Sequence, residues 1–158
     1  MNRIVLVIVA MLTVGCASAN LTVVRPLASP ARQISLEVKS ATDAAMTSEQ
    51  ESRLRTLLTS SLGESGVTVK PKSPDIGVFD GEIQRYSPGN RALRYFFGFV
   101  GAGRGSFQST WRVVDSTGQE VGSCRVDGSI VMGAFGGSYD DVLEKVGERL
   151  GEFLAGSK

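Results

Sequence analysis

The amino-acid sequence predicts an α+β fold: a two-layer sandwich in which a mixed, mostly antiparallel sheet of about five strands carries two helices on one face. Two observations lead to this prediction. Several segments alternate apolar and polar residues with a period of two, which is typical of strands that are buried on one face only. Two other segments each carry one apolar stripe at helical spacing, and a stripe of this kind must be buried against another element.

The first predicted strand covers residues 34–38, where Ile, Leu and Val alternate with polar side chains. Thr47 and Gln50, and the overlapping pair of Ser48 and Glu51, have the spacing of a capping box, which predicts the start of a helix. The leucines that follow at helical spacing are Leu54, Leu57, Leu58 and Leu62. Because this helix connects two strands, we expect those strands to be parallel and joined by a crossover.

Four further strands are predicted after the first helix. A short one begins at residues 67–69, and a longer one covers residues 76–86. The clearest alternation lies at residues 107–113 and is followed by the turn sequence 115–118, in which glycine can take the positive φ that closes a hairpin. Residues 123–132 then form the returning strand of that hairpin, so the later strands are expected to be antiparallel.

A final helix is predicted to begin near Asp140 and Asp141, whose carboxylates suit the positive end of the helix dipole. Its apolar stripe consists of Val142, Val146, Leu150, Phe153 and Leu154. Gly147 and Gly151 lie one turn apart and cost ~1 kcal/mol each in helix propensity. We therefore expect another backbone to come close at this side of the helix.

Composition excludes several classes of function. The chain has no histidine, which removes the commonest general base and the commonest zinc ligand. Asp75, Asp80 and Glu82 could gather on one sheet face, but a solvated outer face explains them better than a metal site. Cys124 shares a face with valine and isoleucine, which predicts a buried thiol, with intermolecular pairing as the alternative. We therefore expect neither an enzyme nor a cofactor.

The first residues of the chain form a separate unit. A basic residue, Arg3, precedes the apolar run of residues 4–12, which small residues and Cys16 then end. This run is too short to cross a bilayer, which takes roughly 20 apolar residues, and it is typical of an export signal that is removed. The mature domain would then carry equal numbers of basic and acidic residues, which argues against nucleic-acid binding.

The end of this run resembles the lipobox of bacterial lipoproteins, although Thr13 departs from the usual Leu or Val. The resemblance implies that Cys16 is joined to diacylglycerol and becomes the new N-terminus. It also implies a lipoprotein signal peptide at 1–15, a lipidated N-terminus and tether at 16–33, and a single α+β domain at 34–158. Within the tether, residues 21–24 could add an edge strand. An ordinary secretory signal cut nearby is the alternative.

The segment between Ile83 and Val114 has an unusual composition. It contains five arginines and no acidic residue, together with seven of the eleven aromatic residues of the chain. Arginine beside aromatic residues and glycines suits a docking surface, whether for anionic head groups, polysaccharide or an acidic partner, and we expect an envelope protein. The residues predicted to bind the partner are Arg91, Arg94, Tyr95, Phe96, Phe97 and Arg104. Residues 95–100 could instead be part of the core, with the glycines marking bulges.

A glycan or a small ligand is the second candidate occupant. The glycine-rich loops at 98–105 and 133–137 would then form the binding site. Neither loop has the Gly-Lys-Ser or Gly-Lys-Thr sequence of a phosphate-binding loop.

The segment from Gly103 to Gly105, the strand ending Trp111-Arg112-Val113-Val114 and the turn Asp115-Ser116-Thr117-Gly118 together resemble an uncharacterised family of small bacterial lipoproteins. The likeness covers residues 34–154 and implies a periplasmic α+β domain without catalytic residues. More distantly, the element order is similar to periplasmic domains of lipoproteins that activate cell-wall synthases or help export curli. Ala17 follows Cys16, and the absence of aspartate there is similar to Gram-negative lipoproteins sent to the outer membrane.

Overall fold

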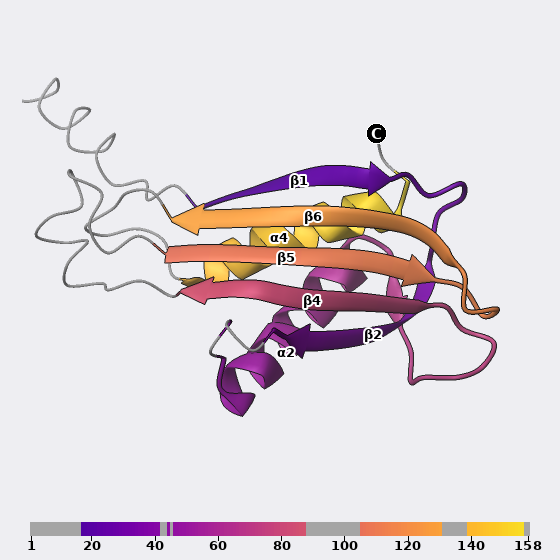
Figure 1. Ribbon diagram of the computed structural model, residues 1–158, viewed down its shortest axis with the longest axis horizontal. Helices are drawn as coiled ribbons and strands as arrows, with labels where there is room; N and C mark the ends of the chain where they lie inside the picture. Colours follow the sequence, from indigo (N-terminus) through magenta and orange to yellow (C-terminus); the bar gives the residue numbers. More distant parts are fainter. Residues whose placement is uncertain (1–16, 42–43, 45, 88–104, 131–138, 157–158) are drawn as a thin grey trace, which may run out of the picture.

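The computed structural model describes residues 17–41, 44, 46–87, 105–130 and 139–156, which form one mixed sheet and two helices (Figure 1). The sheet has six strands in the order β1-β6-β5-β4-β2-β3. The bounds are β1 (Ala17–Arg25), β2 (Gln33–Ser40), α2 (Ser48–Glu64), β3 (Thr68–Val69), β4 (Val78–Ser87), β5 (Gly105–Val114), β6 (Glu120–Ile130) and α4 (Tyr139–Leu154). The α+β class is confirmed, with one more strand than predicted.

The pairs β1–β6, β6–β5 and β5–β4 are antiparallel. Strand β2 is parallel to both of its neighbours, β4 and β3. The predicted parallel pair on either side of the first helix is therefore confirmed: α2 connects β2 to β3, and these two strands are parallel. Residues 105–130 fold back on themselves as the predicted hairpin. Its turn contains Gly118 with a φ of 85°, a conformation that favours glycine.

The predicted tether at 16–33 is wrong for residues 17–25, because these form the nine-residue strand β1. This strand pairs with β6 along its whole length, from Ala17 opposite Ile130 to Arg25 opposite Ser123. The sequence pattern that could have predicted β1 was weak, because this edge strand consists mostly of small residues. Its partner, β6, follows about a hundred residues later in the chain. Residues 21–24 belong to an edge strand, as the alternative interpretation proposed.

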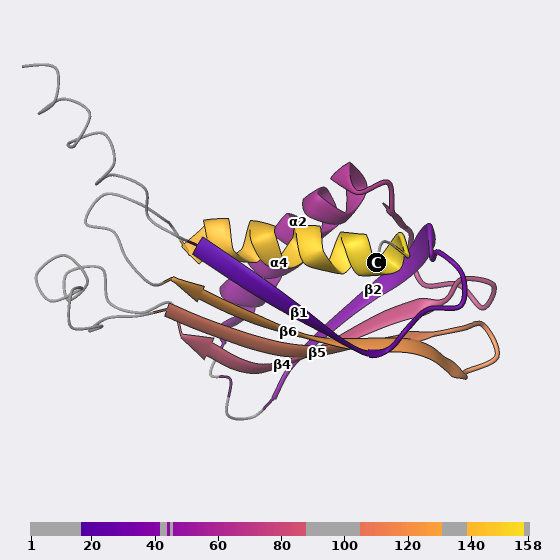
Figure 2. The ribbon, with the colours of Figure 1, turned by 90° about the horizontal axis from the view of Figure 1, so that it is seen from above.

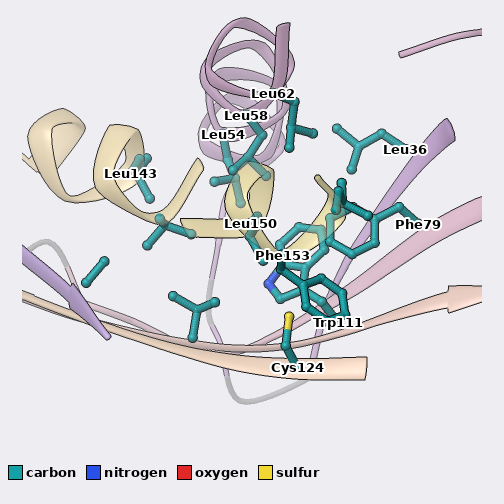
Figure 3. Close-up of a cluster of buried hydrophobic side chains, with 14 of the residues drawn as sticks. Leu36, Leu54, Leu58, Leu62, Phe79, Trp111, Cys124, Leu143, Leu150 and Phe153 are labelled. Atoms are coloured by element: carbon teal, nitrogen blue, oxygen red, sulfur yellow. The ribbon is translucent and has the colours of Figure 1, made fainter. Parts of the chain in front are cut away.

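Both helices lie on the same side of the curled sheet (Figure 2). Alternation directs Phe79, Trp111 and Cys124 toward that side, where they meet the leucines of the two helices (Figure 3). The side chains of Leu54, Leu58 and Leu150 are fully buried there. The hydrophobic core therefore lies between the helices and the sheet, and no helix of the described residues covers the other face of the sheet, called the open face below.

The two helices pack against each other closely where α4 carries its glycines. A Cβ atom built on Gly147 would lie 2.4 Å from the Cβ of Ser61, and one built on Gly151 would lie 2.1 Å from the Oγ of Ser65. Real Cβ atoms do not approach neighbours this closely. The sequence-based expectation of a close backbone approach at this side of the helix is confirmed.

The start of α2 is also as the sequence predicts. Thr47 is the N-cap residue, and its hydroxyl accepts a hydrogen bond from the backbone N–H of Gln50, while the Gln50 side chain accepts from the Thr47 N–H. This reciprocal pair satisfies two backbone donors that the first turn would otherwise leave without partners.

Candidate functional site

The open face of the sheet holds a depression of about 500 Å³. The two helices cover the opposite face (Figure 2). Residues from β1, β2, β4, β5 and β6 line the depression, so five of the six strands contribute to it. Successive side chains of a strand point to opposite faces of a sheet. Because Phe79 and Trp111 are buried on the core face, the residues next to them in β4 and β5 lie on the open face. The polar lining residues are Lys39, Asp80, Glu82, Thr110, Arg112, Glu120, Ser123 and Arg125.

A row of alternating charges crosses one side of this face. Arg112 on β5 donates to the Oδ2 atom of Asp80 on β4, through Nε at 3.0 Å and Nη2 at 2.6 Å. The Nζ atom of Lys39 on β2 lies 3.7 Å from Asp80 and 3.9 Å from Glu37. Glu37 in turn accepts from Lys72 at 2.5 Å. The row joins three strands and the loop that carries Lys72, with each charge beside an opposite one.

Asp80 is the centre of this row, because its side chain is only 13% exposed whereas those of Lys39 and Arg112 are more than half exposed. The hydrogen bond from Arg112 to Asp80 raises the pKa of the guanidinium, and the hydrogen bond to Glu37 raises the pKa of Lys72. Arg112 and Lys72 therefore keep their positive charges at neutral pH. Exposed ion pairs of this kind add little to the stability of the fold.

The adjacent row of the same face has charges without such pairing. Register places Lys39 opposite Glu82, Glu82 opposite Thr110 and Thr110 opposite Arg125. Within the part of the chain that the structure describes, Glu82 and Arg125 form no ion pair. A carboxylate, a hydroxyl and a guanidinium thus lie side by side across three strands, a mixed set of hydrogen-bond donors and acceptors that suits a polar ligand.

The chemistry of reactive groups near this face is limited. Cys124 contributes to the depression but is only 1% exposed, and burial raises the pKa of its thiol from 9.0 to about 12. It therefore stays protonated at neutral pH and is a poor nucleophile. Among the described residues, no group of three or more metal-ligating side chains occurs. The arrangement can bind and orient a polar molecule.

The edge of the sheet at β1 is the other surface feature. Val23 and Val24 are 49% and 70% exposed and are the large hydrophobic residues exposed within the described ranges. Val24 is bulged, because the register with β6 shifts between Val23 and Arg25. It borders the depression, whereas Val23 lies beside Phe153 of α4 on the other side of the sheet.

The residues that the sequence singled out for partner binding fall outside the described residues, as does Cys16. These residues are Arg91, Arg94, Tyr95, Phe96, Phe97 and Arg104. Asp80 and Glu82, which were interpreted as part of a solvated outer face, both lie on the open face. Sequence reasoning missed the depression, and the signal available for it was the run of polar residues at alternate positions in β4, β5 and β6.

Comparison with known proteins places the chain among domains without an assigned activity. Residues 8–134, more than half of the chain, match the family described as "Domain of unknown function (DUF4410)". The chain belongs to the DUF4410 family. No curated protein sequence matches this DUF4410 chain. None of its helices in the described ranges is both long and apolar enough to span a bilayer.

A solved structure shows the same fold. A dodecamer of a methionine variant of PelC from Paraburkholderia phytofirmans matches the DUF4410 chain with a TM-score of 0.52 and 16% identity, covering 89% of this chain and 96% of that one. A second PelC dodecamer from the same organism has a TM-score of 0.49 and 17% identity, covering 89% and 97%. At this identity, the first match shows a shared fold alone.

Proposed function

We propose that this chain is a lipid-anchored lipoprotein of the bacterial envelope, and that its domain binds an envelope protein partner on the periplasmic side of the outer membrane without catalysing a reaction. The observation that carries the proposal is the sequence up to Cys16: a basic start, a short apolar run and small residues directly before a cysteine. The domain itself would be a two-layer sandwich of helices and sheet with one open polar face.

Anchoring would occur through acyl groups on Cys16. One acyl chain gives only reversible membrane binding, whereas two or more hold a protein on the bilayer stably. Ala17 in place of aspartate after the cysteine supports delivery to the outer membrane.

Mass spectrometry of the natively expressed protein tests the anchor. We expect the N-terminal peptide to begin at Cys16 and to carry the added mass of a diacylglyceryl group. The variant Cys16→Ser should retain its signal segment and yield no acylated peptide. A free thiol at Cys16 in the native protein would overturn the proposed anchor.

The partner-binding surface is proposed from sequence composition. Arg91, Arg94 and Arg104 lie in a segment without acidic residues, and the aromatic residues between them could supply apolar contacts. The described residues that precede and follow this segment, Ser87 and Gly105, lie at the same end of the sheet, in adjacent antiparallel strands.

Charge reversal tests this surface. The triple variant Arg91→Glu, Arg94→Glu and Arg104→Glu should lose co-purification of the partner after crosslinking in cells, because like charges would replace the complementary ones. A matched control reverses three exposed cations elsewhere, Lys70, Lys145 and Arg149, and should keep the partner. Equal recovery with both triple variants would refute the surface.

Binding of a glycan or a small ligand is the second candidate function. The depression on the open face favours it, because Glu82, Thr110 and Arg125 offer donors and acceptors side by side. Soluble cell-wall fragments at a hundredfold excess over the dissociation constant should stabilise the protein by about 2.7 kcal/mol, which a thermal shift detects. Arg125→Ala should abolish that shift. A screen without any shift would exclude this function for the fragments used.

A further inference from the structure

The distance between Cys16 and the folded domain is set by β1. Ala17 is the first residue of this strand and pairs with Ile130 of β6. The next residue, Ser18, pairs with Ser129, and the two hydroxyl oxygens lie 3.1 Å apart. Consecutive Cα atoms are about 3.8 Å apart. The cysteine is therefore attached directly to a hydrogen-bonded strand, without a linker of described residues between them.

A flexible tether would behave differently. A linker of the length first predicted, residues 16–33, would have a root-mean-square end-to-end distance of roughly 23 Å and would let the domain move freely above a membrane. With β1 beginning at Ala17, an acyl group on Cys16 would hold one end of the sheet within a few ångströms of the lipid headgroups.

The composition of this sheet end suits such contact. Register places Ala17, Ile130 and Gly105 in one row across β1, β6 and β5, and places a serine from each of four strands in the row beside it. These serines are Ser18, Ser129, Ser106 and Ser87. The row is uncharged, so bringing it against headgroups would not require a charge to lose its water.

Described charged residues near this end include Arg85 of β4 and Asp127 of β6, each two positions from the serine row, and residues of α4 and α2. Asp140, in the first turn of α4, is paired with Arg53 of α2. Asp141 also has an interaction partner. The carboxylates of Asp140 and Asp141 are thus engaged within the protein, which limits their repulsion by anionic headgroups.

We infer that the sheet end formed by Ala17, Ser18, Ser87, Gly105 and Ser129 lies against the headgroup layer of the leaflet that holds the lipid anchor. The hairpin turn between β5 and β6 then points away from the membrane. This inference rests on the proposed acylation of Cys16. It specifies which end of the sheet faces lipid and which end points into the periplasm.

Fluorescence quenching can test the arrangement in the full-length, natively processed protein. Ser87→Cys places a label at the proposed membrane end, and Thr117→Cys places one at the hairpin turn. The native Cys124 is buried and should not be labelled. The protein would be reconstituted in vesicles of phosphatidylethanolamine and phosphatidylglycerol with nitroxide groups on a fraction of the headgroups.

We expect strong quenching of the label at Ser87→Cys and almost none at Thr117→Cys. The ten residues of β5 separate the two ends by about 33 Å, which exceeds the reach of contact quenching. Insertion of a Gly-Ser spacer between Cys16 and Ala17 should reduce the quenching at Ser87→Cys. The flexible spacer would let the sheet end move away from the headgroups.

A third label distinguishes an alternative orientation, in which the domain lies on its β1 edge. Val24→Cys would then be quenched most, and that result would overturn the inference, as would equal quenching at the two sheet ends. Mass spectrometry of the same sample separates the two proposals. An acylated Cys16 with no preference between the ends refutes the orientation alone, whereas an unmodified Cys16 refutes the anchor and the orientation together.

Discussion

Trp111 stacks on Phe79 in the core, with ring centroids 4.8 Å apart and ring planes inclined by 28°. Both rings are at most 1% exposed. The indole lies over Gly81, the residue paired with Trp111 across β4 and β5. Its N–H donates to the Oγ of Ser109 at 2.7 Å, so this buried polar group is satisfied. The glycine therefore creates the space in which the largest side chain of the core is held.

Gly81→Ala should destabilise the protein by about 1–3 kcal/mol, because its Cβ would lie 2.2 Å from the Cζ3 atom of Trp111 and the core would be overpacked. Chemical denaturation measures the change. Gly63→Ala in α2 is the matched control, since no atom outside the adjoining helix backbone lies within 4 Å of its Cβ position. That variant should be neutral or gain up to about 1 kcal/mol from helix propensity. Equal stability changes in the two variants would contradict this explanation.

Gly147→Ala should also be destabilising, by about 1–3 kcal/mol, although alanine favours helices. The added methyl group would lie 2.4 Å from the Cβ of Ser61 and would push α4 away from α2. Combining it with Ser61→Gly removes that contact, so the double variant should be more stable than the sum of the two single changes predicts. Additive effects in a double-mutant cycle would show that the helices do not meet here.

Much of the fold could be predicted because one face of each long strand is buried. The period of two assigned Phe107, Trp111 and Val113 to the core face, and the structure buries all three. Likewise, the stripe of α4 and the capping box of α2 depend on neighbours within one or two turns. These signals are local, so they are visible in the sequence alone.

The features that sequence reasoning missed depend on pairing between distant segments. Strand β1 forms because β6 offers it an edge, and two adjacent exposed valines with a bulge obscure its alternation. Similarly, the alternation placed Asp80 on the polar face but could not show that Lys39 and Arg112 lie beside it. Their positions depend on the register between β2, β4 and β5, which the sequence pattern does not reveal. The predicted partner-binding residues 91–104 lie outside the described residues and stay a prediction.

The thiol of Cys124 should make stability depend on pH in the alkaline range. Burial raises its pKa in the folded protein from 9.0 to about 12. The folded state therefore keeps the proton at pH values where the unfolded chain has lost it. The stability contribution is fully present below pH 9.0 and is lost as the pH rises toward about 12. We expect denaturation midpoints to fall across this window.

Cys124→Ala is the variant that isolates this effect. It should be less stable at neutral pH by about 1 kcal/mol, since a buried sulfur atom is lost, but its stability should fall less between pH 9.0 and about 12. Thiol reactivity gives an independent measurement in a Cys16→Ser background: Cys124 should react slowly with a disulfide reagent in the folded protein and rapidly in urea. Fast reaction without urea, or parallel pH profiles for both variants, would show that the thiol is accessible in the folded protein.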